Sequence, residues 1–216
     1  MKASLLKSAI VGIAFGLTCL NAAAQITAIP DQHHPRGEIR IVNPKLRAVL
    51  ANAHAQVGQT IRYDPAYREL AYPGGDVPLD RGVCTDVIIR AYRAARFDLQ
   101  IAVHEDMRRA FPAYPKHWGL KRPNTSIDHR RVPNLQTYFT RQRQNLPVSS
   151  RAIDYLAGDL VTWMLPTGQD HIGLVSNRIA DNGRPLIVHN IGAGAQIEDV
   201  LFEWKITGHY RPAAAR

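Results

Sequence analysis

A cysteine and two later histidines carry the chemistry that this sequence suggests. Cys84 begins a stretch, CTDVIIRA, in which Val87, Ile88 and Ala91 follow it at helical spacing. A helix start carries partial positive charge and free backbone N–H groups, which favour a thiolate and predict a pKa below about 8.5. A thiolate attacks carbonyl carbons when a general base, usually histidine, takes the proton and a third polar group holds that ring.

Two histidines could supply the general base and the polar group that orients it. His171 begins a strand-like segment directly after a turn, and His189 lies near the end of the next one among apolar neighbours. Each alone would more often be a structural histidine, and Cys84, on an apolar helix face, would more often be an inert buried thiol. The order of the three residues is more specific than any one of them, and it favours a nucleophile with its base.

The elements around these residues predict an α+β fold. Apolar spacing predicts helices over residues 44–56, from Cys84 onward, and over 134–143. Four strands are expected, at residues 160–165, 172–176, 186–191 and 201–210. Between the helices, residues 103–133 contain four prolines and many cations, and they are expected to be an irregular basic insertion. Helices followed by antiparallel strands are typical of the α+β class.

The distance between the two histidines sets a condition on the hairpin that joins them. If Asn182 and Gly183 formed an ideal two-residue turn, His189 would pair with Ser176. His171 would then lie about 17 Å away along the strand. A working pair of rings therefore requires a wider loop or a bulge.

Residues 1–24 predict export, because they have the three parts of a secretory signal. Lys2 and Lys7 precede an apolar run, and three alanines ending at Ala24 form the expected cleavage site. The run is too short for a transmembrane span, which takes about 20 residues. Removal of this segment leaves Cys84 as the single cysteine, so no disulfide can form within the chain in a periplasmic or secreted location.

Composition describes one domain with anionic partners. Residues 44–212 are long enough for one core, and residues 25–43 read as an extended N-terminal arm that could occlude the cleft. The formal charge of +9 falls to +7 without the signal, which favours peptidoglycan or another anionic cell-envelope substrate. No nucleic-acid pattern, transmembrane segment, metal motif or cofactor motif is found, and a monomer is expected.

Short motifs then resemble a known group of enzymes. The segments GQTIRY, RGVCTDV, GDLVTW, HIGLVS and LIVHN, in this order, resemble the papain-like cysteine peptidases of the cell wall known as the NlpC type. More closely, RGVCTDVIIRAYR, HEDM, IDHRRVPNL and EDVLFEWKITGHYR resemble an exported bacterial family, domain of unknown function 1287, which is itself similar to that group. The first resemblance covers about residues 45–195.

The resemblance implies a fold and roles for four residues. It implies a papain-like fold, with N-terminal helices and the catalytic cysteine at a helix start packed on an antiparallel sheet. Carried over to matching positions, Cys84 is the nucleophile, His171 the base and His189 the orienting residue. The hydroxyl of Tyr63 would lie near the oxyanion, together with the backbone N–H of Cys84.

The chain departs from the peptidase pattern beside the cysteine and in the basic insertion. Val83 replaces the usual aspartate, and Thr85 and Asp86 replace a small Ser-Gly pair, so Asp86 is expected to influence substrate choice. The insertion either builds a substrate groove or forms a solvated basic surface. Its segment IDHRR is either a substrate clamp or an internal salt bridge. The residues expected to bind substrate are Asp86, Trp118, His129, Arg130 and Arg131.

Three functions remain open from the sequence. The first is an exported cysteine hydrolase that cleaves amide or peptide bonds through a Cys-His-His triad and a thioester, with peptidoglycan stem peptides as the expected substrate. The second is an acyltransferase or esterase that acts on a lipid or lipoprotein. The third is a non-catalytic module that binds the cell wall or a partner protein through the same cleft.

Overall fold

Helix α1 forms where the sequence places a helix cap, a proline in the first turn and apolar residues at helical spacing. The computed structural model describes residues 37–215. In α1 (Pro44–Ala55), the side chain of Asn43 accepts hydrogen bonds from the backbone N–H groups of Lys45 and Leu46, and Pro44 occupies the first turn. Leu46, Val49, Leu50 and Ala53 make up its buried face. The expected helix over residues 44–56 is therefore confirmed to within one residue.

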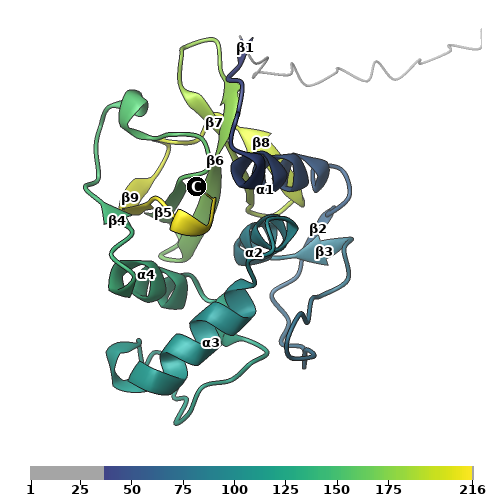
Figure 1. Ribbon diagram of the computed structural model, residues 1–216, viewed down its shortest axis with the longest axis vertical. Helices are drawn as coiled ribbons and strands as arrows, with labels where there is room; N and C mark the ends of the chain where they lie inside the picture. Colours follow the sequence, from purple (N-terminus) through teal and green to yellow (C-terminus); the bar gives the residue numbers. More distant parts are fainter. Residues whose placement is uncertain (1–36, 216) are drawn as a thin grey trace, which may run out of the picture. The chain divides into compact units, whose positions relative to one another are not determined.

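Helix α2 (Cys84–Ala94) is the most buried helix in the described chain. Its residues from Cys84 through Tyr92 are all buried, and Figure 1 shows it between α1 and α3 (Leu99–Ala110). The first turn is closed by Asp86, whose carboxylate accepts a hydrogen bond of 2.7 Å from the backbone N–H of Val83. Burial on all sides fixes the helix start that carries Cys84.

The strands of the main sheet follow the order β4-β9-β5-β6-β7-β8, and β1 also pairs with β6. The printed pairings of this sheet are all antiparallel. Its strands are β1 (Gly37–Glu38), β4 (Asn145–Leu146), β5 (Leu160–Met164), β6 (Asp170–Ile179), β7 (Pro185–Asn190), β8 (Ala195–Glu198) and β9 (Lys205–Tyr210). A small parallel pair consists of β2 (Arg62–Tyr63) and β3 (Arg81–Gly82). The predicted α+β class is confirmed.

Two apolar clusters form the core. One cluster joins helices α1, α2 and α3 to strand residues such as Ile172 and Leu174, and it includes Cys84. The other contains Trp163, Val175 and Ile187, and partly buried residues such as Trp204 pack against it. Neighbouring β6 residues alternate between the clusters, as the period of two in a strand requires. The start of β6, which carries His171 and Ile172, therefore lies between the two clusters.

The expected irregular insertion over residues 103–133 is wrong in its first part. Residues 103–110 belong to α3, whose N-cap Asp98 accepts a hydrogen bond from the Gln100 N–H and whose Leu99, Val103 and Met107 are buried. The prolines that suggest a loop lie beyond this helix. The remaining elements of the segment are η1 (Phe111–Ala113), η2 (Asp128–Arg130) and α4 (Val132–Arg141). The long irregular stretch is thus confined to residues 114–127.

The C-terminal strand prediction also needs correction. Residues 201–204 form a turn, and β9 begins at Lys205. A short strand, β8, precedes that turn and was not predicted, because its four residues alternate between apolar and polar side chains over only the shortest run that signals a strand. The closing short helices are η3 (Ala152–Asp154) and η4 (Ala213–Ala215).

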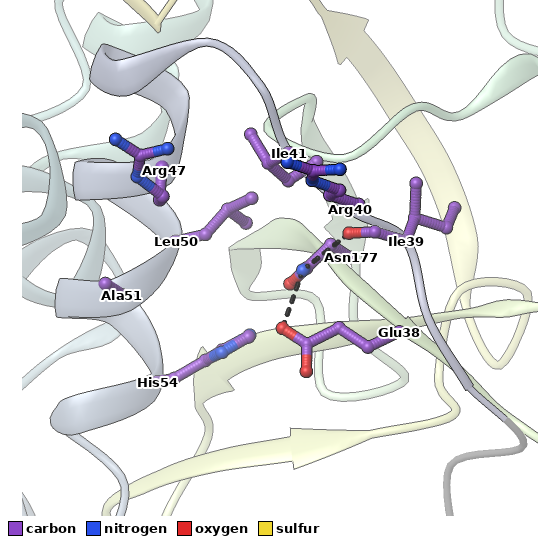
Figure 2. Close-up of a pocket in the computed structure, with 9 residues that line it drawn as sticks. All are labelled: Glu38, Ile39, Arg40, Ile41, Arg47, Leu50, Ala51, His54 and Asn177. Atoms are coloured by element: carbon purple, nitrogen blue, oxygen red, sulfur yellow. Dashed lines mark hydrogen bonds between the residues drawn. The ribbon is translucent and has the colours of Figure 1, made fainter.

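The described end of the N-terminal arm lies on β6. Figure 2 shows Asn177 donating hydrogen bonds to the Glu38 carboxylate, at 2.8 Å, and to the Ile39 carbonyl, at 2.9 Å. Glu38 and Ile39 help to line a pocket of about 480 Å³ against α1, which does not include Cys84. No residue of the described part of the arm lines the cavity that Cys84 lines. The predicted signal and residues 25–36 of the arm lie outside the described residues, and within residues 37–215 no helix has the length and apolarity of a membrane span.

Candidate functional site

The register between β6 and β7 brings the two histidines together. Leu174 pairs with Val188, while Ile179 near the turn pairs with Pro185, so the register shifts between Val175 and Ile179. Continuing the shifted register puts His189 opposite Gly173 and not opposite Ser176. The irregular connection that the histidine pair requires is therefore confirmed, and His171 Nε2 lies 2.8 Å from His189 Nδ1.

Glu198 extends this pair and was missed in the sequence. On β8, its carboxylate Oε2 lies 2.8 Å from Nε2 of His189. The residue was missed because β8 itself was missed. The local signals were a four-residue alternation of apolar and polar side chains and a glutamate nine residues after His189, and neither shows which residue the carboxylate contacts until the β7–β8 register is known.

Aromatic rings surround the two histidines. The His171 ring lies 5.8 Å from both Trp163 and Trp204, centroid to centroid, and the His189 ring lies 6.1 Å from Trp204. The side chains of His171 and His189 are almost fully buried. Burial and then the electrostatic effect of the neighbouring His189 lower the pKa of His171 to about 3. The imidazole of His171 is therefore neutral at physiological pH.

Cys84 approaches the same strand from the helix side. The backbone N–H of Ile172, the residue after His171, bonds to the Cys84 sulfur and favours the thiolate, as do the N–H groups of Thr85 and Cys84 itself. No hydrogen bond joins the sulfur to the His171 ring among the described residues. The Nδ1 atom of His171 makes none either in that part of the chain, and its other ring nitrogen, Nε2, is the one engaged by His189.

The expected low pKa of the cysteine is wrong for this arrangement. Cys84 is 4% exposed. Burial raises the pKa of its thiol to about 12, and the Asp86 carboxylate adds to the rise, although the Ile172 N–H opposes it. The helix-start effect is present, but removal of the sulfur from water outweighs it.

This pKa predicts slow alkylation of Cys84 at neutral pH. In a Cys19→Ser background, the rate with iodoacetamide should keep rising with pH through pH 9, since only the thiolate reacts and it forms above the thiol pKa. The same protein unfolded in urea provides the control, with an inflection near the ordinary pKa of a cysteine thiol, about 8.5. An inflection well below pH 8 in the folded protein would contradict the prediction.

A cavity of about 390 Å³ opens beside Cys84. Tyr63, Trp118, Arg131 and Asp170 are among its lining residues. Tyr63 pairs with Gly82, two residues before Cys84, and burial followed by the charges of Cys84 and Asp86 raises its pKa to about 12. The Tyr63 hydroxyl therefore stays protonated and can donate a hydrogen bond into the cavity.

The residues expected to bind substrate divide into two groups. Trp118 and Arg131 line the cavity together, with the Arg131 guanidinium 4.0 Å from the centre of the Trp118 ring. Asp86 and His129 do not line it, and both are buried, at 2% exposure. Burial lowers the pKa of His129 to about 4. Direct contact of Asp86 and His129 with a substrate in this cavity is therefore not supported.

Arg130 lines the cavity but is bound internally. Its guanidinium donates two hydrogen bonds to the Asp86 carboxylate, at 2.8 and 2.9 Å, and its carbonyl accepts one from the Thr85 hydroxyl. This geometry favours the internal salt bridge over the substrate clamp for this part of IDHRR. No group of three or more His, Cys, Asp or Glu with the geometry of a metal site occurs between residues 37 and 215.

The fold and the site define an α+β protein whose buried cysteine lies beside a hydrogen-bonded histidine pair. The chain belongs to the family described as a domain of unknown function (DUF1287), which matches residues 50–212. A relative, the uncharacterized protein YijF of Escherichia coli (strain K12), is 57% identical over 164 residues, or 76% of this chain and 80% of the relative. The chain is also similar to the structure of NlpC1 from Trichomonas vaginalis, at 15% identity and a TM-score of 0.40. This match covers 81% of the chain but only 46% of NlpC1.

Proposed function

We propose that this protein is an exported cysteine hydrolase that cleaves amide bonds, with peptidoglycan stem peptides as substrate. The observation that carries the proposal is the meeting of the Cys84 helix start with the His171–His189 pair at the first residues of β6. Export rests on the sequence pattern of residues 1–24. The substrate class rests on the basic composition and on Arg131 in the cavity, whose guanidinium suits carboxylates on a peptide and stacks on the Trp118 ring.

The chemistry uses neutral partners. As the Cys84 sulfur bonds to the carbonyl carbon, the thiol proton passes to Nδ1 of His171, and the oxyanion receives hydrogen bonds from the Cys84 N–H and the Tyr63 hydroxyl. His171 then gives the proton to the leaving amine as the C–N bond breaks, which leaves a thioester. Water attacks the thioester, its proton passes through His171 to the sulfur, and the acid product departs. Substrate binding must close the gap between sulfur and ring, as catalytic hydrogen bonds often tighten only in the complex.

Digestion of purified stem peptides tests this function. Wild-type protein should produce new amine and acid termini by mass spectrometry, and Cys84→Ala should produce none. His171→Ala should reduce cleavage to the background as well, because no base remains. Both variants need unchanged unfolding curves to count. Equal cleavage by wild type and Cys84→Ala would refute a cysteine mechanism, and cleavage of lipid esters in place of peptides would favour the acyltransferase or esterase.

One observation favours a second candidate, a non-catalytic binding module. The Cys84 thiol is buried, has a raised pKa and makes no hydrogen bond with His171 among the described residues. Such a module would bind stem peptides equally well with Cys84→Ala and cleave them with neither protein. Binding without cleavage in the digestion would therefore decide for it.

A further inference from the structure

Glu198 ends a continuous chain of hydrogen bonds that leads toward the cysteine. Its carboxylate lies 2.8 Å from Nε2 of His189, and Nδ1 of His189 lies 2.8 Å from Nε2 of His171. The neighbouring carboxylate, Asp199, is engaged by Arg184 at 2.7 Å. Glu198 is thus the carboxylate that reaches the histidine pair.

The register of β8 holds Glu198 in this place. Glu198 pairs with Ile187, and Gln196 pairs with His189, so Glu198 and His189 lie on the same face as diagonal neighbours. His189 is completely buried, whereas the Glu198 side chain is 34% exposed. The carboxylate can therefore remain hydrated on one side while it accepts a hydrogen bond from His189 on the other.

The Glu198 carboxylate determines which ring nitrogens of His189 and His171 carry protons. An ionised carboxylate only accepts hydrogen bonds, so Nε2 of His189 must carry a proton, and in a neutral ring Nδ1 then accepts. Nε2 of His171 must therefore donate, which leaves Nδ1 of His171 without a proton. Without the carboxylate, His189 could carry its proton on Nδ1 and donate in the other direction. His171 would then hold its proton on Nδ1 and could not take one from a thiol.

We propose that Glu198 is a positioning residue that fixes the tautomers of His189 and His171 and so keeps Nδ1 of His171 free to act as a base toward Cys84. The proposal rests on the proposed function for the role of His171, but the tautomers can be measured without it. Glu198 also supplies the negative charge that the pair needs when His171 becomes protonated during the reaction.

Nitrogen NMR of the histidine rings tests the positioning directly. In wild type, both rings should be protonated on Nε2 alone. In Glu198→Ala a second population with protons on Nδ1 should appear at both histidines, and Glu198→Asp should restore part of the wild-type population. Glu203→Gln removes an exposed carboxylate from the following turn and should change nothing. The wild-type tautomers in a folded Glu198→Ala would overturn the proposal. If the alanine variant does not fold, Glu198→Leu, which fills more of the space and has no hydrogen-bond acceptor, decides in the same way.

Acylation of Cys84 by p-nitrophenyl acetate tests whether the positioning by Glu198 affects reactivity. The rate of p-nitrophenolate release should fall by at least roughly 10–100-fold in Glu198→Ala, the loss seen when a partner that orients a metal-bound histidine is removed. It should stay unchanged in Glu203→Gln. If wild type and Cys84→Ala release the phenolate equally, the hydrolase proposal fails while the NMR result still decides the role of Glu198. Changed tautomers with an unchanged Cys84-dependent rate would overturn the link to the base.

Discussion

Replacing Asp86 with alanine should lower the free energy of unfolding by about 3–5 kcal/mol. The Asp86 and Arg130 side chains are 3% and 2% exposed and form a bidentate ion pair. The alanine variant leaves the Arg130 charge buried without its partner, and it also removes the acceptor of the Val83 N–H. Urea unfolding followed by tryptophan fluorescence measures the change. The loosened first turn should also speed alkylation of Cys84.

Two matched variants separate the buried charge from other causes. The double variant Asp86→Leu/Arg130→Met replaces both charges with apolar groups, and it should recover most of the lost stability. Arg151→Ala breaks the exposed pair with Asp154, whose side chains are 72% and 37% exposed, and should have a much smaller effect. Equal losses in Asp86→Ala and Arg151→Ala would contradict the importance given to the buried pair.

Replacing Asp159 with asparagine should cost about 3 kcal/mol, since it removes one partner from a buried ionic group. Asp159 is completely buried. It accepts two hydrogen bonds from Arg211, at 2.8 and 2.7 Å, one from His209 at 2.8 Å, and one from the Leu156 N–H at 2.9 Å. The aspartate of GDLVTW therefore ties the start of β5 to the end of β9 and the chain that follows it.

The same carboxylate predicts the pH dependence of stability. Burial opposes the ionisation of Asp159, but the bonds from Arg211, His209 and Leu156 outweigh it and lower its pKa. A lowered pKa contributes stability above the unfolded value of about 3.9, which is lost as the pH falls through the folded value. Below about pH 4, wild type should thus lose stability more steeply than Asp159→Asn. Glu69→Gln, an exposed carboxylate, should follow wild type, and parallel curves for wild type and Asp159→Asn would refute the prediction.

Local signals predicted much of the frame. The cap at Asn43, the helical spacing after Cys84 and the turn before His171 depend on residues a few positions apart, and each marked an element correctly. The missed helix α3 had the same kind of signal in Asp98, Leu99, Val103 and Met107. The following prolines suggested a loop over the whole stretch, although a proline ends a helix just before its own position and leaves the earlier turns free to form.

Pairing at a distance could not be predicted in this way. The ion pair between Asp86 and Arg130 joins residues 44 positions apart, and Glu198 reaches His189 only through the β7–β8 register. The hairpin was the one such feature that sequence reasoning anticipated, because two histidines at fixed positions can meet only if the register shifts. That expectation followed from the assumption that His171 and His189 are in contact, since Asn182 and Gly183 alone predict a regular two-residue turn.

The sequence by itself determined that a cysteine stands at a helix start and that two strand histidines follow it in order, because residue type and periodicity are local properties. Only the tertiary structure decided the state of those groups. The pKa of Cys84 is set mainly by the packing that buries it, and the tautomers of His171 and His189 depend on a carboxylate from another strand. Desolvation and hydrogen-bond partners arise when distant segments meet, so the reactivity of the Cys84 thiol belongs to the folded chain.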